Sequence, residues 1–200
     1  MLTDEGHMLE VHTADNILNT TQIIEKARDP QVLLCTLSNQ ITSEVMDAKP
    51  SLGMIANYAV GYNNIDIDAA TARGILVTNT PGALTEATAD LAFALLLAAA
   101  RRIPEGDKFC REGKFHGWLP ELLLGRELHG RTIGIAGAGR IGSAMARRAR
   151  GFGLNILYYN RSAKPELEES LHAKRVELDE LFEQSDFVSV HLPGTPETTG

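Results

Sequence analysis

The most constraining feature of this sequence is the segment 131–142, in which a short apolar run leads directly into a glycine-rich turn. Residues Thr132–Ala136 are apolar after a β-branched start, which predicts a buried strand. The turn Gly137-Ala138-Gly139-Arg140-Ile141-Gly142 follows at once, and residues 143–150 predict a helix. A strand, a G-x-G-x-x-G turn and a helix in this order form the phosphate-binding corner of a dinucleotide-binding fold.

Each glycine of this turn has its own predicted role. Gly137 permits the tight turn, Gly139 lets a pyrophosphate approach bare backbone, and Gly142 lets the helix and strand pack closely. The free N–H groups at the start of the helix would then face the anion. The alternative is a glycine-rich strand–helix turn that holds no ligand.

Apolar runs and helical patterns alternate along the rest of the chain, which predicts an α/β protein with parallel sheets. In residues 1 to about 80 the predicted strands are 32–37, 53–59 and 75–78, the predicted helices are 19–27, 43–48 and 67–73, and 8–12 is a possible short strand. In the second half the further strands are 155–159 and 186–191, and the helices are 104–112, 166–172 and 178–184. The segment 115–130 is expected to be irregular.

The longest predicted helix is Leu84–Arg102, whose middle is apolar nearly all round. Such a helix should be buried, either by another domain or subunit or as a core helix within one domain.

The net charge of −7 argues against nucleic acid or an anionic membrane as partner. The sequence has only two cysteines and no signal-peptide pattern, which predicts a cytoplasmic protein. The histidines show no metal-ligand spacing, so no metal site is expected.

The end of the second predicted strand of the second half bears on the choice of dinucleotide. An NAD site usually has Asp or Glu about 20 residues past the glycine turn, where it accepts from the ribose 2′-hydroxyl. Here the residues 18 positions past Gly142 are Asn160-Arg161-Ser162. Arg161 could meet a 2′-phosphate and Ser162 could add a hydrogen bond, so the sequence favours NADP(H) over NAD(H). The alternative is that Arg161 is a solvated surface charge.

Five spaced motifs, residues 57–66, 77–82, 85–90, 137–142 and 191–198, together resemble the D-isomer-specific 2-hydroxyacid dehydrogenase family. The stretch 158–162 is similar to the glyoxylate/hydroxypyruvate reductase branch. The resemblance implies two Rossmann-like parallel-sheet domains, a flavodoxin-like substrate domain and an NAD(P)-binding domain of which only the first part is present. The implied bounds are 1–83 for the N-terminal part of the substrate (catalytic) domain, 84–103 for an interdomain and dimer helix, and 104–200 for the NAD(P)-binding domain.

The resemblance also assigns candidate sites. The backbone at Val60 and Gly61 would take the substrate carboxylate, and Ser38 is a further substrate-binding candidate at a neighbouring strand end. The cofactor-binding candidates are Gly137, Ala138, Gly139, Arg140, Ile141, Gly142, Asn160, Arg161, Ser162, Leu192 and Pro193. Asn63 departs from the family's usual aspartate at that position.

The expected activity is hydride transfer by an NADP(H)-preferring homodimeric reductase that converts small 2-oxo acids, glyoxylate or hydroxypyruvate, to 2-hydroxy acids. The family's catalytic arginine, glutamate and histidine follow the His-Leu-Pro segment, so they are expected beyond Gly200, and elements are also expected before Met1. The 200 residues alone are therefore predicted to be inactive. The alternatives are a dinucleotide-sensing regulator of the same fold that binds a protein partner without turnover, and a short dimerisation module.

Overall fold

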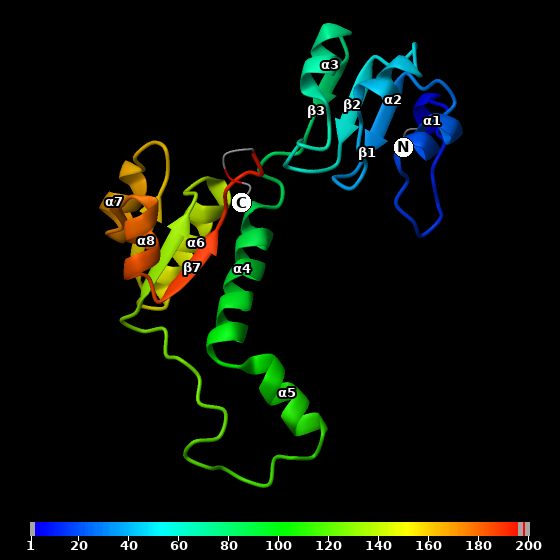
Figure 1. Cartoon of the computed structure of the whole chain (residues 1–200). Helices are drawn as coiled ribbons and strands as arrows, with labels where there is room; N and C mark the ends of the chain where they lie inside the picture. Colours follow the sequence, from blue (N-terminus) through cyan, green and yellow to red (C-terminus); the bar gives the residue numbers. More distant parts are fainter. Residues whose placement is uncertain (1–2, 196–197, 199–200) are drawn as a thin grey trace. The chain divides into compact units, whose positions relative to one another are not determined.

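The computed structural model describes residues 3–195 and Thr198, and the chain divides into two compact units, Met1–Ala83 and Leu84–Gly200 (Figure 1). Each unit has its own parallel sheet with helices. The predicted α/β class with two parallel-sheet units is confirmed.

The first unit contains a three-stranded sheet in the order β1-β2-β3. The strands are β1 (Val32–Cys35), β2 (Met54–Asn57) and β3 (Leu76–Thr78), and the helices are the 3₁₀ turn η1 (Thr3–Glu5), α1 (Thr20–Lys26), α2 (Ser43–Asp47) and α3 (Ile67–Ala72). All pairings are parallel, with Met54 of β2 opposite both Val32 and Leu76.

One face of this sheet packs on the helices and forms the core of the unit. Ile55 of β2 and Val45 of α2 are fully buried, and Cys35 is almost so. On the opposite face, Leu34 and Leu76 are more than half exposed. Successive strand residues therefore divide between a packed and an open face, as the two-residue period of a strand requires.

Side-chain caps set the ends of the helices in this unit. Asn19 and Gln22 form a reciprocal capping box at the start of α1, and Asp66 accepts from the amide of Ala69 at the start of α3. At the other end of α1, the buried Lys49 donates to the carbonyls of Ile24 and Ala27. These bonds satisfy backbone groups that a helix leaves unpaired at its termini.

The second unit contains a four-stranded parallel sheet in the order β6-β5-β4-β7. Its strands are β4 (Thr132–Ala136), β5 (Asn155–Tyr159), β6 (Lys174–Arg175) and β7 (Phe187–Val190), and its helices are α4 (Thr85–Ala100), α5 (Ile103–Arg111), α6 (Arg140–Gly151), α7 (Pro165–Leu171) and α8 (Leu178–Gln184). The first strand of the unit lies inside the sheet and the chain winds outward on both sides of it. This is the strand order of one mononucleotide-binding half of a Rossmann fold.

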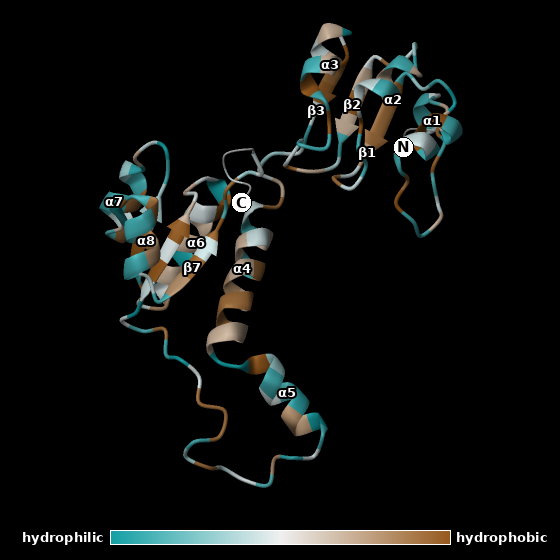
Figure 2. Cartoon of the chain, viewed as in Figure 1, coloured by the Kyte–Doolittle hydropathy of each residue, from teal (hydrophilic) through white to brown (hydrophobic). Residues whose placement is uncertain are grey.

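Helix α4 packs on α6 and contributes Phe93 to the core of the second unit. The ring centroids of Phe93 and Phe152 are 4.7 Å apart. Figure 2 shows α4 largely in the brown of apolar residues, in contrast to the teal of α7 and α8. Leu91 and Leu95 are each 61% exposed, so packing covers only part of the apolar surface that the sequence predicted to be buried.

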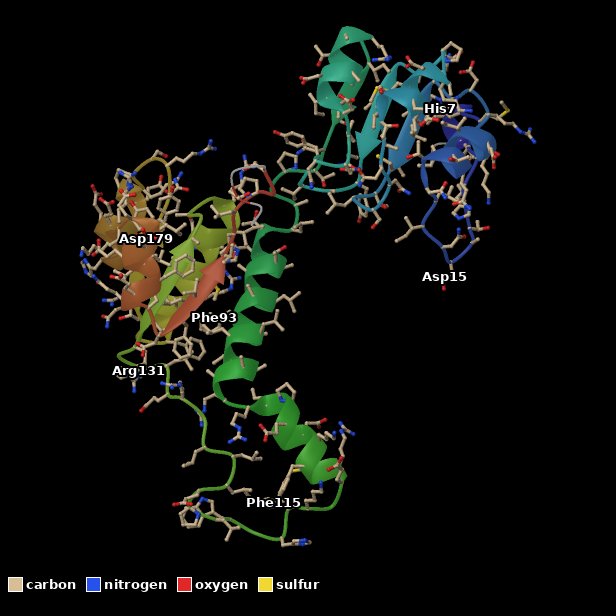
Figure 3. All side chains as sticks on the ribbon, in the orientation of Figure 1. His7, Asp15, Phe93, Phe115, Arg131 and Asp179 are labelled. Carbon is tan, nitrogen blue, oxygen red and sulfur yellow. The ribbon has the colours of Figure 1, made fainter. Side chains whose placement is uncertain are left out.

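Other differences from the sequence-based expectations lie at element ends and in polar segments. The possible strand at 8–12 is wrong, because no strand forms there. The helix expected to start at residue 143 begins at Arg140, directly after the glycine turn, and strand β6 has no counterpart among the predictions. The segment 115–130 is irregular as expected, and Figure 3 marks its first residue, Phe115, beyond α5.

Candidate dinucleotide-binding site

The glycine turn between β4 and α6 has a backbone that requires two of its three glycines. Gly137 has φ of +97°, and a Cβ on it would lie 2.6 Å from the carbonyl oxygen of His191. A Cβ on Gly142 would overlap with the carbonyl oxygen of Gly137 and lie 3.2 Å from Ile135 Cγ2. A side chain at Gly137 would therefore strain the backbone and press on the residues that follow β7, and one at Gly142 would force the start of α6 away from the turn.

Gly139 differs from the other two, because no heavy atom lies within 4 Å of the position its Cβ would take. It is exposed and forms the N-cap of α6 without a side-chain cap. By helical geometry the N–H groups of Arg140, Ile141 and Gly142 have no carbonyl one turn earlier to bond. Open backbone beside unpaired N–H groups at a helix N-terminus fits the pyrophosphate of a dinucleotide.

The loop after β7 lies against this turn. A Cβ on Gly137 would lie 3.0 Å from Leu192 Cδ2, so Leu192 belongs to the same site, and Pro193 beside it is exposed. The neighbouring His191 shares a hydrogen bond of 2.9 Å between its Nε2 and Ser189 Oγ. Burial lowers the pKa of His191 below its ordinary value, which favours the neutral ring. Part of the 191–198 motif, residues 196–197, lies outside the described residues.

The loop after β5 contains the other cofactor candidates. Gly137 N–H donates to the carbonyl of Tyr159, which places this loop beside the glycine turn. The side-chain amide of Asn160 donates to the carbonyl of Ser162 at 2.9 Å, which closes a short turn around Arg161. The guanidinium of Arg161 is exposed and has no hydrogen bond or ion pair within residues 3–195. The three predicted cofactor loops of the second unit thus meet at the carboxyl edge of its sheet.

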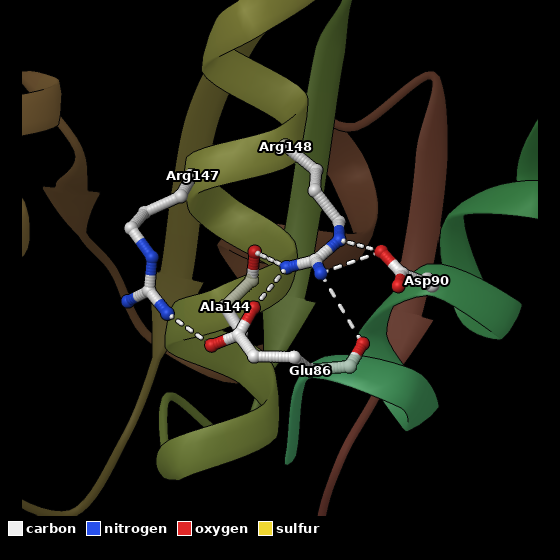
Figure 4. Close-up of polar contacts among 5 residues, drawn as sticks. All are labelled: Glu86, Asp90, Ala144, Arg147 and Arg148. Carbon is white, nitrogen blue, oxygen red and sulfur yellow. Dashed lines mark hydrogen bonds and ion pairs between the residues drawn. The ribbon is translucent and has the colours of Figure 1, made fainter. Parts of the chain in front are cut away.

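Two arginines near the end of α6 join this helix to α4. Arg148 and Arg147 bind the first turns of α4 (Figure 4). Arg148 Nη1 lies 2.9 Å from Glu86 Oε2, and its Nε donates to Asp90 Oδ1 at 2.7 Å. The hydrogen bond from Arg148 holds the pKa of Glu86 below its ordinary value. These contacts join α4 to α6, the helix that follows the glycine turn. The residues that they link are about 60 positions apart in the chain.

The substrate candidates of the first unit lie at the carboxyl edge of the other sheet. The carbonyls of Val60 and Gly61 accept hydrogen bonds, each 2.8 Å long, from the side-chain amides of Asn79 and Asn57. Among the described residues, the N–H groups of Val60 and Gly61 donate to no protein acceptor. Ser38 is exposed in the neighbouring loop after β1.

The buried asparagines Asn57 and Asn64 are site residues that the sequence reasoning missed. Asn64 Nδ2 donates to the carbonyls of Thr36 and Asn39, at 3.1 and 3.0 Å, and so ties the loop after β1 to the loop after β2. The available signal was Asn57, an amide side chain at the end of the apolar run of β2. A buried polar group needs a specific partner, so its position indicated a hydrogen bond to a neighbouring loop. Across the residues that the structure describes, there is no cluster of three or more metal-ligating side chains, and no helix is long and apolar enough to cross a membrane.

Comparison with known proteins agrees with this architecture. A family model described as D-isomer specific 2-hydroxyacid dehydrogenase, NAD binding domain, matches residues 93–200. The glyoxylate reductase of Korarchaeum cryptofilum is 54% identical over 177 residues, which are 88% of this chain and 53% of that protein. Among solved structures, the TT0316 protein from Thermus thermophilus has a TM-score of 0.91 at 45% identity over 98% of this chain and 61% of that one.

A further solved relative contains ligands. The D-lactate dehydrogenase from Aquifex aeolicus, complexed with NAD and lactic acid, has a TM-score of 0.80 at 31% identity and covers 87% of this chain and 53% of its own. The chain thus spans little more than half the length of such relatives. Its second unit has the fold and the glycine turn of a nicotinamide-dinucleotide-binding domain. Because the family model covers more than half of the sequence, this chain belongs to the D-isomer specific 2-hydroxyacid dehydrogenase family.

Proposed function

We propose that this chain is part of an NADP(H)-preferring reductase that converts small 2-oxo acids, glyoxylate or hydroxypyruvate, to 2-hydroxy acids. The second unit would hold the dinucleotide along the glycine turn and the loops after β5 and β7. The bound nicotinamide would supply the hydride. The relatives named glyoxylate reductase support the choice of substrate class.

The observation that carries the choice of NADP(H) is the guanidinium of Arg161, which is exposed and has no partner among the residues that the structure describes. It follows β5, where NAD-binding members of this fold usually have a carboxylate that accepts from the ribose 2′-hydroxyl. Here a carboxylate is replaced by Asn160, whose amide is used within the turn, while Arg161 is exposed. An arginine can give a 2′-phosphate two charge-assisted hydrogen bonds.

Titration of the chain with NADPH and NADH, followed by nicotinamide fluorescence, tests this choice. Arg161→Ala should weaken NADPH binding about tenfold, the effect of losing about 1.4 kcal/mol of charge-assisted hydrogen bonding, and change NADH binding less than twofold. Arg150→Ala removes the same charge from the exposed end of α6 and serves as the matched control. Equal loss of both cofactors in Arg161→Ala would contradict the proposed preference.

The first unit would bind the acid. The carbonyls of Val60 and Gly61 are bound by Asn79 and Asn57, and their N–H groups have no acceptor among the described residues, an arrangement that suits a carboxylate. Ser38 would lie at the rim of this site. Steady-state oxidation of NADPH by the full-length gene product, with glyoxylate, hydroxypyruvate and pyruvate as alternative substrates, tests the substrate class, and an absence of turnover with all three would contradict it.

In this proposal residues 1–83 are the substrate-domain part, 84–103 the interdomain and dimer helix, and 104–200 the first part of the NAD(P)-binding domain. The exposed Leu91 and Leu95 of α4 supply apolar surface for a second subunit. The protein would be a cytoplasmic homodimer with a small-molecule substrate and neither nucleic acid nor membrane as partner. Light scattering of the purified gene product measures its mass directly, and a monomer would contradict the dimer.

A further inference from the structure

The loop that follows β5 is held in place by side chains from neighbouring elements. At its far end, the amide of Lys164 donates to the hydroxyl of Tyr158 at 2.8 Å. The same hydroxyl donates to Glu168 Oε1 on α7 at 2.5 Å. Burial, together with the bond to Glu168, raises the pKa of Tyr158 above its ordinary value, so the phenol remains protonated as this donor.

Arg175 holds the near end of the same loop. Its Nε donates to the carbonyl of Asn160 and its Nη2 to the carbonyl of Arg161, both at 3.1 Å. The ladder between β5 and β6 consists of the two pairs Leu157↔Lys174 and Tyr158↔Arg175, so the backbone beyond has no strand partner on this side. The guanidinium of Arg175 binds the backbone carbonyls that follow the end of this ladder.

We propose that Arg175 is a positioning residue that sets the preference for NADP(H) by fixing the backbone of the 160–162 turn. This inference rests on the proposed function of Arg161. With the carbonyls of Asn160 and Arg161 bound to Arg175, neither oxygen can turn toward the ribose, where it would repel a 2′-phosphate. The side chain of Arg161 then projects from a fixed backbone and loses less conformational entropy when the phosphate binds.

Replacement of Arg175 separates this role from a general structural one. Arg175→Met removes the donors and keeps an unbranched apolar stem, and it should weaken NADPH binding about tenfold while NADH binding changes less than twofold. Arg175→Lys keeps one cationic donor in place of the two that bind the carbonyls and should recover part of the loss. Lys174→Met is the matched control, since Lys174 belongs to the same strand and carries the same charge, but its Nζ pairs with Glu180 at 3.0 Å.

Amide exchange at Lys164 reports on the loop without any cofactor. Its N–H is protected by the bond to Tyr158, and the loss of Arg175 at the near end of the turn should speed its exchange about fivefold. The exposed position of Arg175 leaves the core unchanged, so wild-type melting temperatures are expected for all these variants.

The outcomes distinguish this inference from the proposal on which it rests. If the wild-type chain binds NADPH and NADH equally, the preference itself is wrong and this inference falls with it. If Arg161→Ala abolishes the preference and Arg175→Met keeps it, only the role of Arg175 is refuted. A similar loss of NADPH affinity in Lys174→Met would mean that Arg175 acts through its charge and not through the backbone. The same conclusion would follow if Arg175→Met lost the preference while amide exchange at Lys164 stayed unchanged.

Discussion

Alanine substitutions of two glycines in the same turn should separate cofactor binding from folding. Gly139 and Gly142 are three residues apart, but only Gly142 is packed against other atoms. Gly139→Ala is expected to lose the dinucleotide and keep the fold. Gly142→Ala is expected to lose stability, because its methyl group would overlap with the carbonyl oxygen of Gly137.

The magnitudes follow from the surroundings of each position. At Gly142, alanine gains about 1 kcal/mol of helix propensity. Forcing a methyl group into closed packing costs about 3 kcal/mol, so the net loss is about 2 kcal/mol, or about 4–8 °C in Tm for a protein of this size. At Gly139, with φ of −74° and open space, alanine should cost only about 0.5–1 kcal/mol, because alanine is a poorer N-cap residue than glycine. Its methyl group would occupy the approach of the pyrophosphate and weaken NADPH binding at least about tenfold.

Thermal unfolding followed by circular dichroism, together with NADPH titration of each variant, measures both effects. Wild-type affinity in Gly139→Ala would refute the contact between the pyrophosphate and this backbone. A Tm within about 2 °C of wild type in Gly142→Ala would refute the claim that close approach of α6 to the turn requires glycine.

Three further outcomes test the packing and electrostatics of the two units. Phe93→Ala should destabilise the second unit by about 3–4 kcal/mol, because it removes a buried ring in contact with a second aromatic ring; denaturant titration measures the loss. Cys110 should react with a maleimide at pH 7.5, while Cys35 should stay unmodified, because it is buried and burial raises its pKa to about 11; mass spectrometry after labelling distinguishes the two. Glu86→Gln should lower Tm at pH 7, and the difference in Tm from wild type should shrink as the pH falls below about 4.5. The reason is that a carboxyl group with a lowered pKa stabilises the fold only while it is ionised. A constant difference in Tm down to pH 3 would contradict the pairing with Arg148.

Local pattern was sufficient for the regular elements of the sheets. Strands 132–136 and 155–159 and the helix 178–184 have the predicted bounds, since each is an apolar or amphipathic run between polar or glycine residues. The structural roles of Gly137 and Gly142 could also be read from their spacing, because a turn this tight leaves few backbone conformations. The segment 8–12, which contains Met8, Leu9 and Val11, was wrongly predicted as a strand, because a local apolar pattern cannot supply the neighbouring strand that a ladder needs.

Contacts between distant parts of the chain were decided by the tertiary structure alone. Strand β6 is two polar residues long and carries no pattern of its own; it exists because the edge of β5 offers partners to Lys174 and Arg175. The pairing of Arg148 with Glu86 likewise joins α6 to α4, and no local pattern in either helix predicts which residue of the other it meets. The sequence by itself determined where a dinucleotide can be held, because the glycine turn is a local geometry. Which side chains orient the loops around that turn depended on the tertiary fold, because each exposed carbonyl is satisfied by whichever donor the neighbouring strand or helix brings within reach.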